Sequence, residues 1–276
     1  MWHRVLGEHL IFNFGLFDQA EIADGAKPGS LGRAEFRAFD RQLELTGLLA
    51  PNRPPVNRIL DLGCGWGGIT QYLAKHFAEC QCIDAINISQ RQLDYCADNL
   101  PLDLRNRVNL YFCNGQDVDL LPDPAVSYDL VVARGAYTHF LHDVFEASVA
   151  RVAQRLAHGG ILLISDTLYR ASDLDSYKSL IPDTVDRLAC ANRKTPDHFV
   201  SVLERSGLNI QDLRVLPSNA EVIHWFRKVQ LNIEQNFPDG VDGPIQELHD
   251  MALSFTQCLA KNQASVYSII ARRIMV

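Results

Sequence analysis

Short apolar runs alternate along the middle of the chain with segments in which apolar residues recur at helical spacing. The apolar runs predict strands over residues 56–62, 80–88, 108–113, 128–133 and 161–165. The segments between them predict helices over residues 69–77, 90–100 and 144–156. Because runs that are apolar throughout suit strands buried on both faces, this order predicts a parallel sheet covered by helices, an α/β architecture.

The segments on either side of this core are mostly helical in pattern. A helix is expected over 31–48, after an aromatic-rich opening and a Gly/Pro break at 24–30. Residues 197–216 predict a helix, a glycine stop and a strand, and residues 265–274 predict a last strand that returns to the sheet edge. The glycine pair after His158 is expected to end the 144–156 helix in a left-handed cap.

We therefore divide the chain into an N-terminal helical cap, residues 1–50, and an α/β domain, residues 51–276. Within the domain, segments around 170–195 and 218–262 are helical in pattern and are interrupted by proline and glycine. These two segments are expected to form a helical lid over the functional site.

Composition and charge narrow the classes of function. The 276 residues carry a net charge of -7 without a long Lys/Arg cluster, so no nucleic-acid partner is expected. No apolar run is long enough to span a bilayer, and the N-terminus does not resemble a secretory signal. The seven cysteines are irregularly spaced, which favours reduced thiols in the cytoplasm over disulfides or a metal site.

The stretch RILDLGCGWGGIT, residues 58–70, joins a predicted strand to a predicted helix through a glycine-rich loop. Such a loop brings backbone N–H groups and a helix N-terminus close to a ligand. Gly63, Gly65 and Gly68 satisfy the dinucleotide-binding spacing, and Asp84 follows about 20 residues later, where a ribose-binding acid is expected. On this spacing alone, a nicotinamide cofactor stays open.

Further segments resemble one family in order along the chain. Asp61 precedes the loop, giving Asp-x-Gly-x-Gly-x-Gly, and INISQRQLDYC, YDLVVARGAYTHF and GGILLISD follow. Together they resemble the small-molecule branch of the class I S-adenosylmethionine-dependent methyltransferases, which includes cyclopropane fatty acid synthases and phosphoethanolamine and sarcosine methyltransferases. The resemblance covers residues 57–215 and implies a doubly wound, mostly parallel, seven-stranded Rossmann-like sheet with S-adenosylmethionine as cofactor.

The resemblance also implies which residues hold the cofactor. At the end of the second strand, where many relatives carry an acid for the ribose, this chain has Asn87, so Asp84 stays as a second choice. Gln116 or Asp117 is expected beside the adenine. The residues expected to bind the cofactor are Asp61, Gly63, Gly65, Gly67, Asn87, Gln92, Gln116, Asp117 and Arg134.

The expected catalytic residue is His139, which aligns with the histidine that phosphoethanolamine methyltransferases use and whose ordinary pKa suits a general base. The aspartate that those relatives carry four positions earlier is Gly135 here, which puts phosphobase chemistry in doubt. Aromatic rings attract a cationic amine or sulfonium. The residues expected to contact the acceptor are Phe14, Tyr137, Tyr169, His224 and Trp225.

The expected reaction is transfer of a methyl group to an oxygen, nitrogen or carbon of a small molecule, with an amine or specialised metabolite as acceptor. Two alternatives stay open. One is an acyl-chain cyclopropane-type or cyclising S-adenosylmethionine enzyme. The other is a NAD-dependent oxidoreductase that uses Gly63, Gly65, Gly68 and Asp84. A homo-oligomer is compatible with the sequence.

Overall fold

The computed structural model describes residues 1–171 and 192–274. Its centre is a seven-stranded sheet in the order β3-β2-β1-β4-β5-β7-β6. The strands are β1 (Arg58–Leu62), β2 (Cys82–Asn87), β3 (Val108–Phe112), β4 (Tyr128–Arg134), β5 (Leu156–Tyr169), β6 (Leu208–Val215) and β7 (Ala264–Arg273). β1 to β5 pair in parallel, and β7 is antiparallel to both of its neighbours. The predicted mostly parallel, seven-stranded sheet is confirmed.

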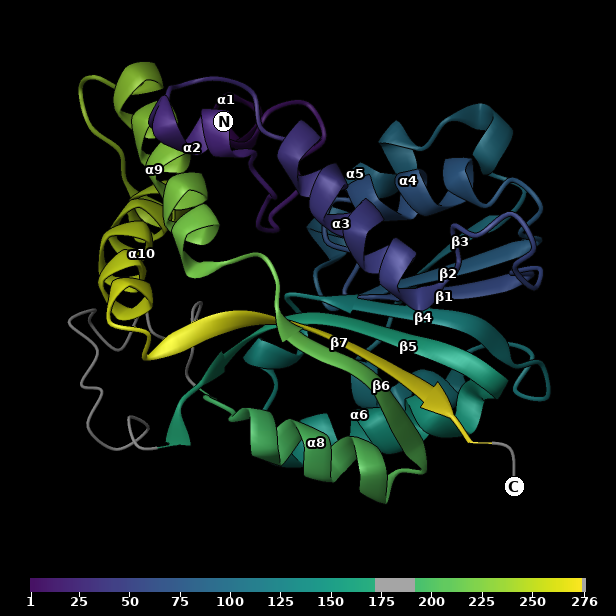
Figure 1. Cartoon of the computed structure of the whole chain (residues 1–276). Helices are drawn as coiled ribbons and strands as arrows, with labels where there is room; N and C mark the ends of the chain where they lie inside the picture. Colours follow the sequence, from purple (N-terminus) through teal and green to yellow (C-terminus); the bar gives the residue numbers. More distant parts are fainter. Residues whose placement is uncertain (172–191, 275–276) are drawn as a thin grey trace.

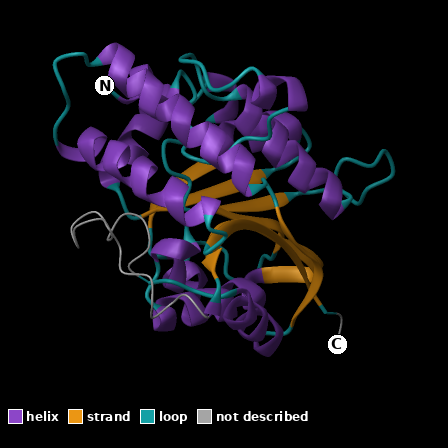
Figure 2. Cartoon of the chain, turned by 60° about the vertical axis from the view of Figure 1, so that its left-hand side comes forward, coloured by secondary structure: helices purple, strands orange, loops and turns teal. Residues whose placement is uncertain are grey.

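Helices cover both faces of this sheet, as Figures 1 and 2 show. They are α3 (Arg33–Thr46), α4 (Gly68–His76), α5 (Gln90–Asn99), α6 (His142–Arg155) and α8 (Pro196–Arg205). In Figure 1, α3, α4 and α5 lie above the sheet and α6 and α8 below it. Successive side chains of β1 point to opposite faces of the sheet. Ile59 packs in the apolar cluster with α3 and α4, whereas Leu60 packs in the cluster with α6 and α8.

A separate group of helices lies beyond the carboxyl ends of the parallel strands (Figure 1). It consists of α1 (Trp2–Leu6), α2 (Gln19–Ala23), α9 (Asn219–Asn236) and α10 (Gly243–Ala260). α1 packs against α9 and α10 in one apolar cluster that joins Leu6 to Phe226 and Leu248. Two segments far apart in the sequence thus form one helical layer. The other predicted lid segment, around 170–195, falls largely on residues 172–191, outside the described residues.

The structure corrects two expectations about element ends. α6 ends at Arg155, and β5 begins at Leu156, so the glycine pair does not cap the helix. A Cβ on Gly160 would lie 2.9 Å from the Tyr128 carbonyl oxygen, so this glycine lets β5 approach β4 beside a register shift. The last strand, β7, lies inside the sheet between β5 and β6, and β6 forms the edge. None of the helices in the described ranges is long and apolar enough to cross a membrane.

Candidate active site

The loop between β1 and α4 has a conformation that only glycine adopts readily. Gly63, Gly65 and Gly67 have φ angles of 80°, 55° and 82°. The backbone N–H groups of Gly63 and Cys64 donate to the Ile86 carbonyl oxygen at 2.9 and 3.0 Å, which ties the loop to β2. The loop therefore has a defined shape, with backbone exposed toward a cavity.

That cavity, about 510 Å³, lies between the glycine loop, the N-terminal segment and α10. The predicted residues that line it are Asp61, Gly63, Gly65, Asn87, Gln92, Arg134 and His139. Gly67 packs instead against α5, where a Cβ would lie 2.8 Å from Cys96 Sγ. The structure thus brings together most of the residues expected to bind the cofactor.

Two buried charged groups lie in the floor of this cavity. Asp61 Oδ2 accepts a hydrogen bond from the Thr70 hydroxyl at 2.6 Å, and burial raises the pKa of Asp61 to about 6. Arg134 lies at the end of β4 with its guanidinium 4.8 Å from the centre of the Phe39 ring, and burial lowers the pKa of Arg134 to about 10. Its Nε and Nη1 have no hydrogen-bond partner among the described residues. The positive charge of Arg134 in the cavity lining suits a carboxylate ligand.

Asp84 does not reach the cavity, which corrects its role as a second choice for the ribose. Its carboxylate is fully buried and accepts hydrogen bonds from Arg58 Nη2 at 2.8 Å, the Tyr128 hydroxyl at 2.7 Å and Asn109 Nδ2 at 2.9 Å. Burial raises the pKa of Asp84, but these hydrogen bonds outweigh it and hold the pKa below its usual range. Asp84 joins strands inside the protein, and Asn87 at the strand end lines the cavity.

Gln116 and Asp117 are not among the described residues that line the cavity; Cys113 and Gly115 form that part of its wall. Both lie in the short 3₁₀ helix η2 (Gly115–Leu120). The Asn114 side chain caps this helix by accepting from the Gln116 N–H at 3.3 Å, so the chain turns away after Gly115. The expectation that these two side chains face the adenine is therefore not supported by their position.

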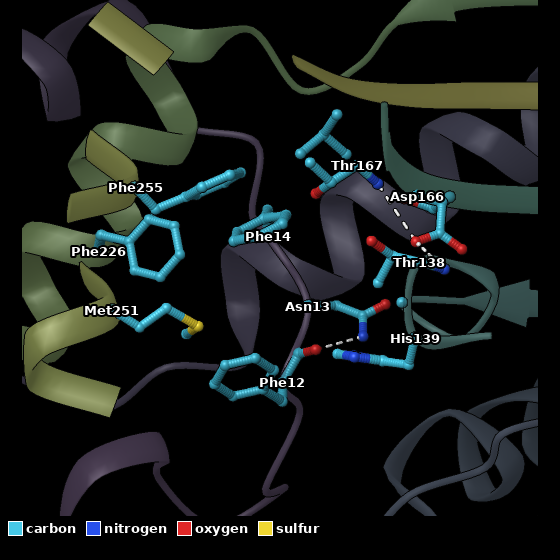
Figure 3. A pocket seen from close by; sticks show the side chains of 13 residues that line it. Phe12, Asn13, Phe14, Thr138, His139, Asp166, Thr167, Phe226, Met251 and Phe255 are labelled. Atoms are coloured by element: carbon cyan, nitrogen blue, oxygen red, sulfur yellow. Dashed lines mark hydrogen bonds between the residues drawn. The ribbon is translucent and has the colours of Figure 1, made fainter. Parts of the chain in front are cut away.

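A second, smaller cavity opens beside the first and shares His139 with it. Figure 3 shows aromatic and thioether side chains along one side and polar side chains along the other. The apolar side consists of Phe12, Phe14, Phe226, Met251 and Phe255, and the polar side includes Asn13, Thr138, His139, Asp166 and Thr167. Five described residues line both cavities, and His139 and Asn13 are the polar side chains among them; the others are Phe12, Gly135 and Met251.

The turn that carries His139, the 3₁₀ helix η3 (Tyr137–His139), is held from two sides. Asp166 Oδ1 accepts from the Thr138 N–H at 3.1 Å, and Lys194 Nζ donates to the Tyr137 carbonyl oxygen at 2.9 Å. Burial and the positive charge of Lys194 lower the pKa of His139, which keeps its imidazole neutral at pH 7. Burial raises the pKa of Asp166 to about 7.

The sequence analysis missed Asp166 and Lys194. GGILLISD places Asp166 at the predicted end of the fifth strand, where ligands bind in open α/β sheets, and that position was the available signal. Lys194 carries no such signal, because its role depends on a contact with a turn far away in the sequence.

Four of the five residues expected to contact the acceptor lie elsewhere. Tyr137, Tyr169 and Trp225 are buried in the apolar clusters of the core. His224 packs against Phe17, with ring centres 4.5 Å apart. Phe14 alone of the five lines the smaller cavity. For Tyr137, Tyr169 and Trp225 the physical reason is that large aromatic side chains near a site more often complete the core than face the ligand.

Trp225 supports the aromatic side of the smaller cavity from behind. Its ring meets Phe12 and Phe14 edge-on, with ring centres 5.5 and 5.3 Å away. Its indole Nε1 donates to the buried carboxylate of Glu35 on α3. Burial raises the pKa of Glu35. The N-terminal segment is thereby fixed between α9 and the sheet.

Residues 59–160 match the family model described as a methyltransferase domain. The chain is 30% identical over 121 residues, 42% of each chain, to a malonyl-[acyl-carrier protein] O-methyltransferase of Halalkalibacterium halodurans. It spans 42% of the length of that relative and 29% of another curated relative.

Solved structures resemble almost the whole chain. A cyclopropane synthase from Mycobacterium tuberculosis superposes with a TM-score of 0.75 at 15% identity, over 98% of this chain and 93% of that one. A coclaurine N-methyltransferase bound to N-methylheliamine and S-adenosylhomocysteine superposes with a TM-score of 0.73 at 16% identity, over 97% and 79%. The likeness establishes a shared fold that includes the helical layer.

Proposed function

We propose that the chain is a class I S-adenosylmethionine-dependent methyltransferase and that it transfers a methyl group from this cofactor to a small-molecule acceptor, because residues 59–160 match a methyltransferase domain. One observation carries the proposal: His139 lines both the large cavity beside the glycine loop and the smaller cavity beside it. A group in that position is able to meet a cofactor on one side and an acceptor on the other.

The large cavity offers suitable groups for each part of the cofactor. The glycine loop lets a ligand approach its backbone at Gly63 and Gly65, and the positive charge of Arg134 suits the carboxylate of the methionyl part. Asn87 and Gln92 line the part of the wall where the ribose is expected. The wall at Cys113 and Gly115 suits the flat adenine ring.

When bound, S-adenosylmethionine supplies an electrophilic methyl group on a positively charged sulfur. The residues that line the large cavity would hold the cofactor so that its methyl group could pass in line to the acceptor atom, with the electron pair of the broken bond left on the sulfur. His139, neutral at pH 7, accepts the proton that the acceptor loses. The η3 turn holds this imidazole in place, so the protein acts chiefly by alignment and by proton removal.

The smaller cavity favours an amine as acceptor. Phe12, Phe14, Phe226 and Phe255 surround its apolar side, and ring faces attract a nitrogen that carries or develops positive charge. Its described lining contains Asp166 but no lysine or arginine, so a phosphate or carboxylate group would find no counter-charge. The N-methyltransferase among the structural neighbours supports this choice.

A second candidate is an S-adenosylmethionine enzyme that acts on an acyl chain, as a cyclopropane synthase does. The aromatic side of the smaller cavity would also pack against a hydrocarbon, and a cyclopropane synthase is among the structural neighbours. The nicotinamide alternative loses its main support, because Asp84 is engaged by Arg58 inside the sheet.

We also infer that residues 1–50 cap the domain, 51–276, together with the lid segment 218–262, and that the protein works in the cytoplasm. The packing of α1 on α9 supports the first inference. The free state of all cysteines within the described residues supports the second, since reduced thiols are typical of the cytoplasm.

A screen of amine, hydroxyl and acyl metabolites with methyl-labelled S-adenosylmethionine tests the proposed reaction. We expect label to pass to an amine, and His139→Ala to lower kcat by about 100-fold or more, the usual contribution of a general base. His142→Ala serves as control, because this exposed histidine lies outside both cavities. A loss of less than about threefold in His139→Ala would make His139 a structural residue.

A further inference from the structure

The β2 side of the large cavity offers no carboxylate to the ribose hydroxyl groups. Asn87 Nδ2 donates to Gln92 Oε1 at 2.7 Å, and Asn87 Oδ1 accepts from the Ile88 N–H at 3.0 Å. Both amide oxygens thus already accept one hydrogen bond within the protein, and this wall offers a hydroxyl donor only neutral, partly used acceptors. Two vicinal hydroxyl groups are themselves donors, and burying them without acceptors costs free energy.

Two carboxylates line this cavity within the described part of the chain, Asp61 and Glu247. Asp61 is buried beneath the loop and bonded to the Thr70 hydroxyl. Glu247, on α10, is half-buried, and its side chain makes no hydrogen bond or ion pair with another described residue. Glu247 is thus the carboxylate of the cavity wall that a ligand is able to use.

Helix α10 presents a stripe of residues to the cavity at helical spacing: Pro244, Glu247, Leu248 and Met251. Met251 also lines the smaller cavity beside His139, so this end of the stripe faces the site of methyl transfer. Glu247 lies one turn before Met251, about 6 Å away along the helix axis. Glu247, unlike Met251, lines only the large cavity, which is the cavity proposed to hold the cofactor.

Asn87 lines the same cavity as this stripe. Leu248, next to Glu247, packs in the same apolar cluster as Trp66 of the glycine loop. The residue before Trp66 is Gly65, whose carbonyl oxygen accepts from Asn87 Nδ2 at 3.4 Å. Glu247, Trp66, Gly65 and Asn87 therefore belong to the wall of one cavity.

We propose that Glu247 accepts hydrogen bonds from the ribose hydroxyl groups of the cofactor, in place of an acid at the end of β2. The inference rests on the proposed function, because it requires a ribose-containing cofactor in this cavity. A carboxylate bonded to two hydroxyl groups makes charge-assisted bonds that are stronger than neutral ones. Since Glu247 is carried by α10 and not by the sheet, a bound cofactor also holds α10 against the glycine loop.

Calorimetric titration of S-adenosylhomocysteine and of 5′-methylthioadenosine tests this role without an acceptor. Glu247→Gln is expected to lower the affinity for both ligands by about tenfold or more, because hydrogen bonds to a charged group are lost. Asp250→Asn is the matched control: Asp250 is on the same helix, outside the cavity lining, and bonds Gln246. This variant is expected to bind both ligands within about twofold of the unchanged protein.

A ligand without one hydroxyl group separates a direct contact from a general loss of structure. With 2′-deoxy-5′-methylthioadenosine, the loss of affinity caused by Glu247→Gln is expected to be smaller by about threefold or more than with 5′-methylthioadenosine. An equal effect on both nucleosides, or an unchanged affinity in the variant, overturns the role of Glu247. If the unchanged protein itself fails to bind S-adenosylhomocysteine, the proposed function fails, and this inference fails with it.

Discussion

Asp84 and Asn87 lie on the same strand, yet Asn87 alone lines the cavity. Their order along the chain suggests Asp84 by its spacing from the glycine loop, whereas the fold buries Asp84 against Arg58. Removing one partner of such a buried ion pair costs about 3–5 kcal/mol, so the carboxylate is not free to bind a ribose. Spacing predicts which strand bears a polar residue, but the partner across the sheet decides what that residue does.

Gly67 offers a test of the loop at the scale of one residue. Alanine there would keep a φ of 82° and place its Cβ 2.8 Å from Cys96 Sγ. We expect Gly67→Ala to shift the loop and to weaken the binding of S-adenosylhomocysteine by about tenfold or more. Calorimetry measures this affinity.

Gly47, at the end of α3, is the matched control for this substitution. Its φ is 79°, but a Cβ there meets no atom within 4 Å. Gly47→Ala is expected to cost about 1–2 kcal/mol of stability through its backbone while keeping the affinity for S-adenosylhomocysteine. Equal affinities in the two alanine variants would contradict the importance of the loop geometry.

At the scale of elements, helices and strands with a strong local pattern could be predicted from the sequence. Elements whose ends depend on long-range pairing could not. The strand expected over 108–113 is β3, Val108–Phe112, and the helix expected over 90–100 is α5, Gln90–Asn99. In contrast, β5 extends to Tyr169 because its second half pairs with β7, a strand about 100 residues later. The apolar pattern of residues 161–165 does not indicate that the strand continues to pair with β7.

The η3 turn is another element that depends on distant contacts. Asp166 from β5 and Lys194 hold its backbone from opposite sides. Asp166 keeps a proton in the folded protein at pH values where the unfolded chain has lost it, because its pKa rises from 3.8 to about 7. Between these two values, the contribution of Asp166 to stability falls as the pH rises.

The substitution Asp166→Asn should therefore stabilise the folded protein more at high pH than at low pH. An asparagine keeps an oxygen for the Thr138 N–H and carries no charge to bury. Relative to the unchanged protein, we expect the free energy of unfolding of the variant to be higher at pH 8 than at pH 5 by about 1 kcal/mol or more. Urea unfolding at the two pH values measures this difference. A difference that is independent of pH would mean that Asp166 is ionised throughout.

At the scale of the whole molecule, the N-terminal cap and the late lid segment form one layer over the cavities. Asn232 of α9 donates to the carbonyl oxygens of Val5 and Gly29 at 2.8 and 3.0 Å, which joins the two segments. The sequence predicts each segment as helical, but their contact spans more than 200 residues and is invisible in local patterns. We propose that this layer acts as the lid that would keep water from the site during methyl transfer.

The central claim is that the large cavity binds S-adenosylmethionine, and calorimetry with the unchanged protein tests it most directly. Titration with S-adenosylhomocysteine is expected to give a Kd of about 1–100 μM with one site per chain, a range ordinary for a small-molecule ligand. NADH is expected to give no heat of binding, because Asp84 is held by Arg58. Micromolar binding of NADH without binding of S-adenosylhomocysteine would contradict the account.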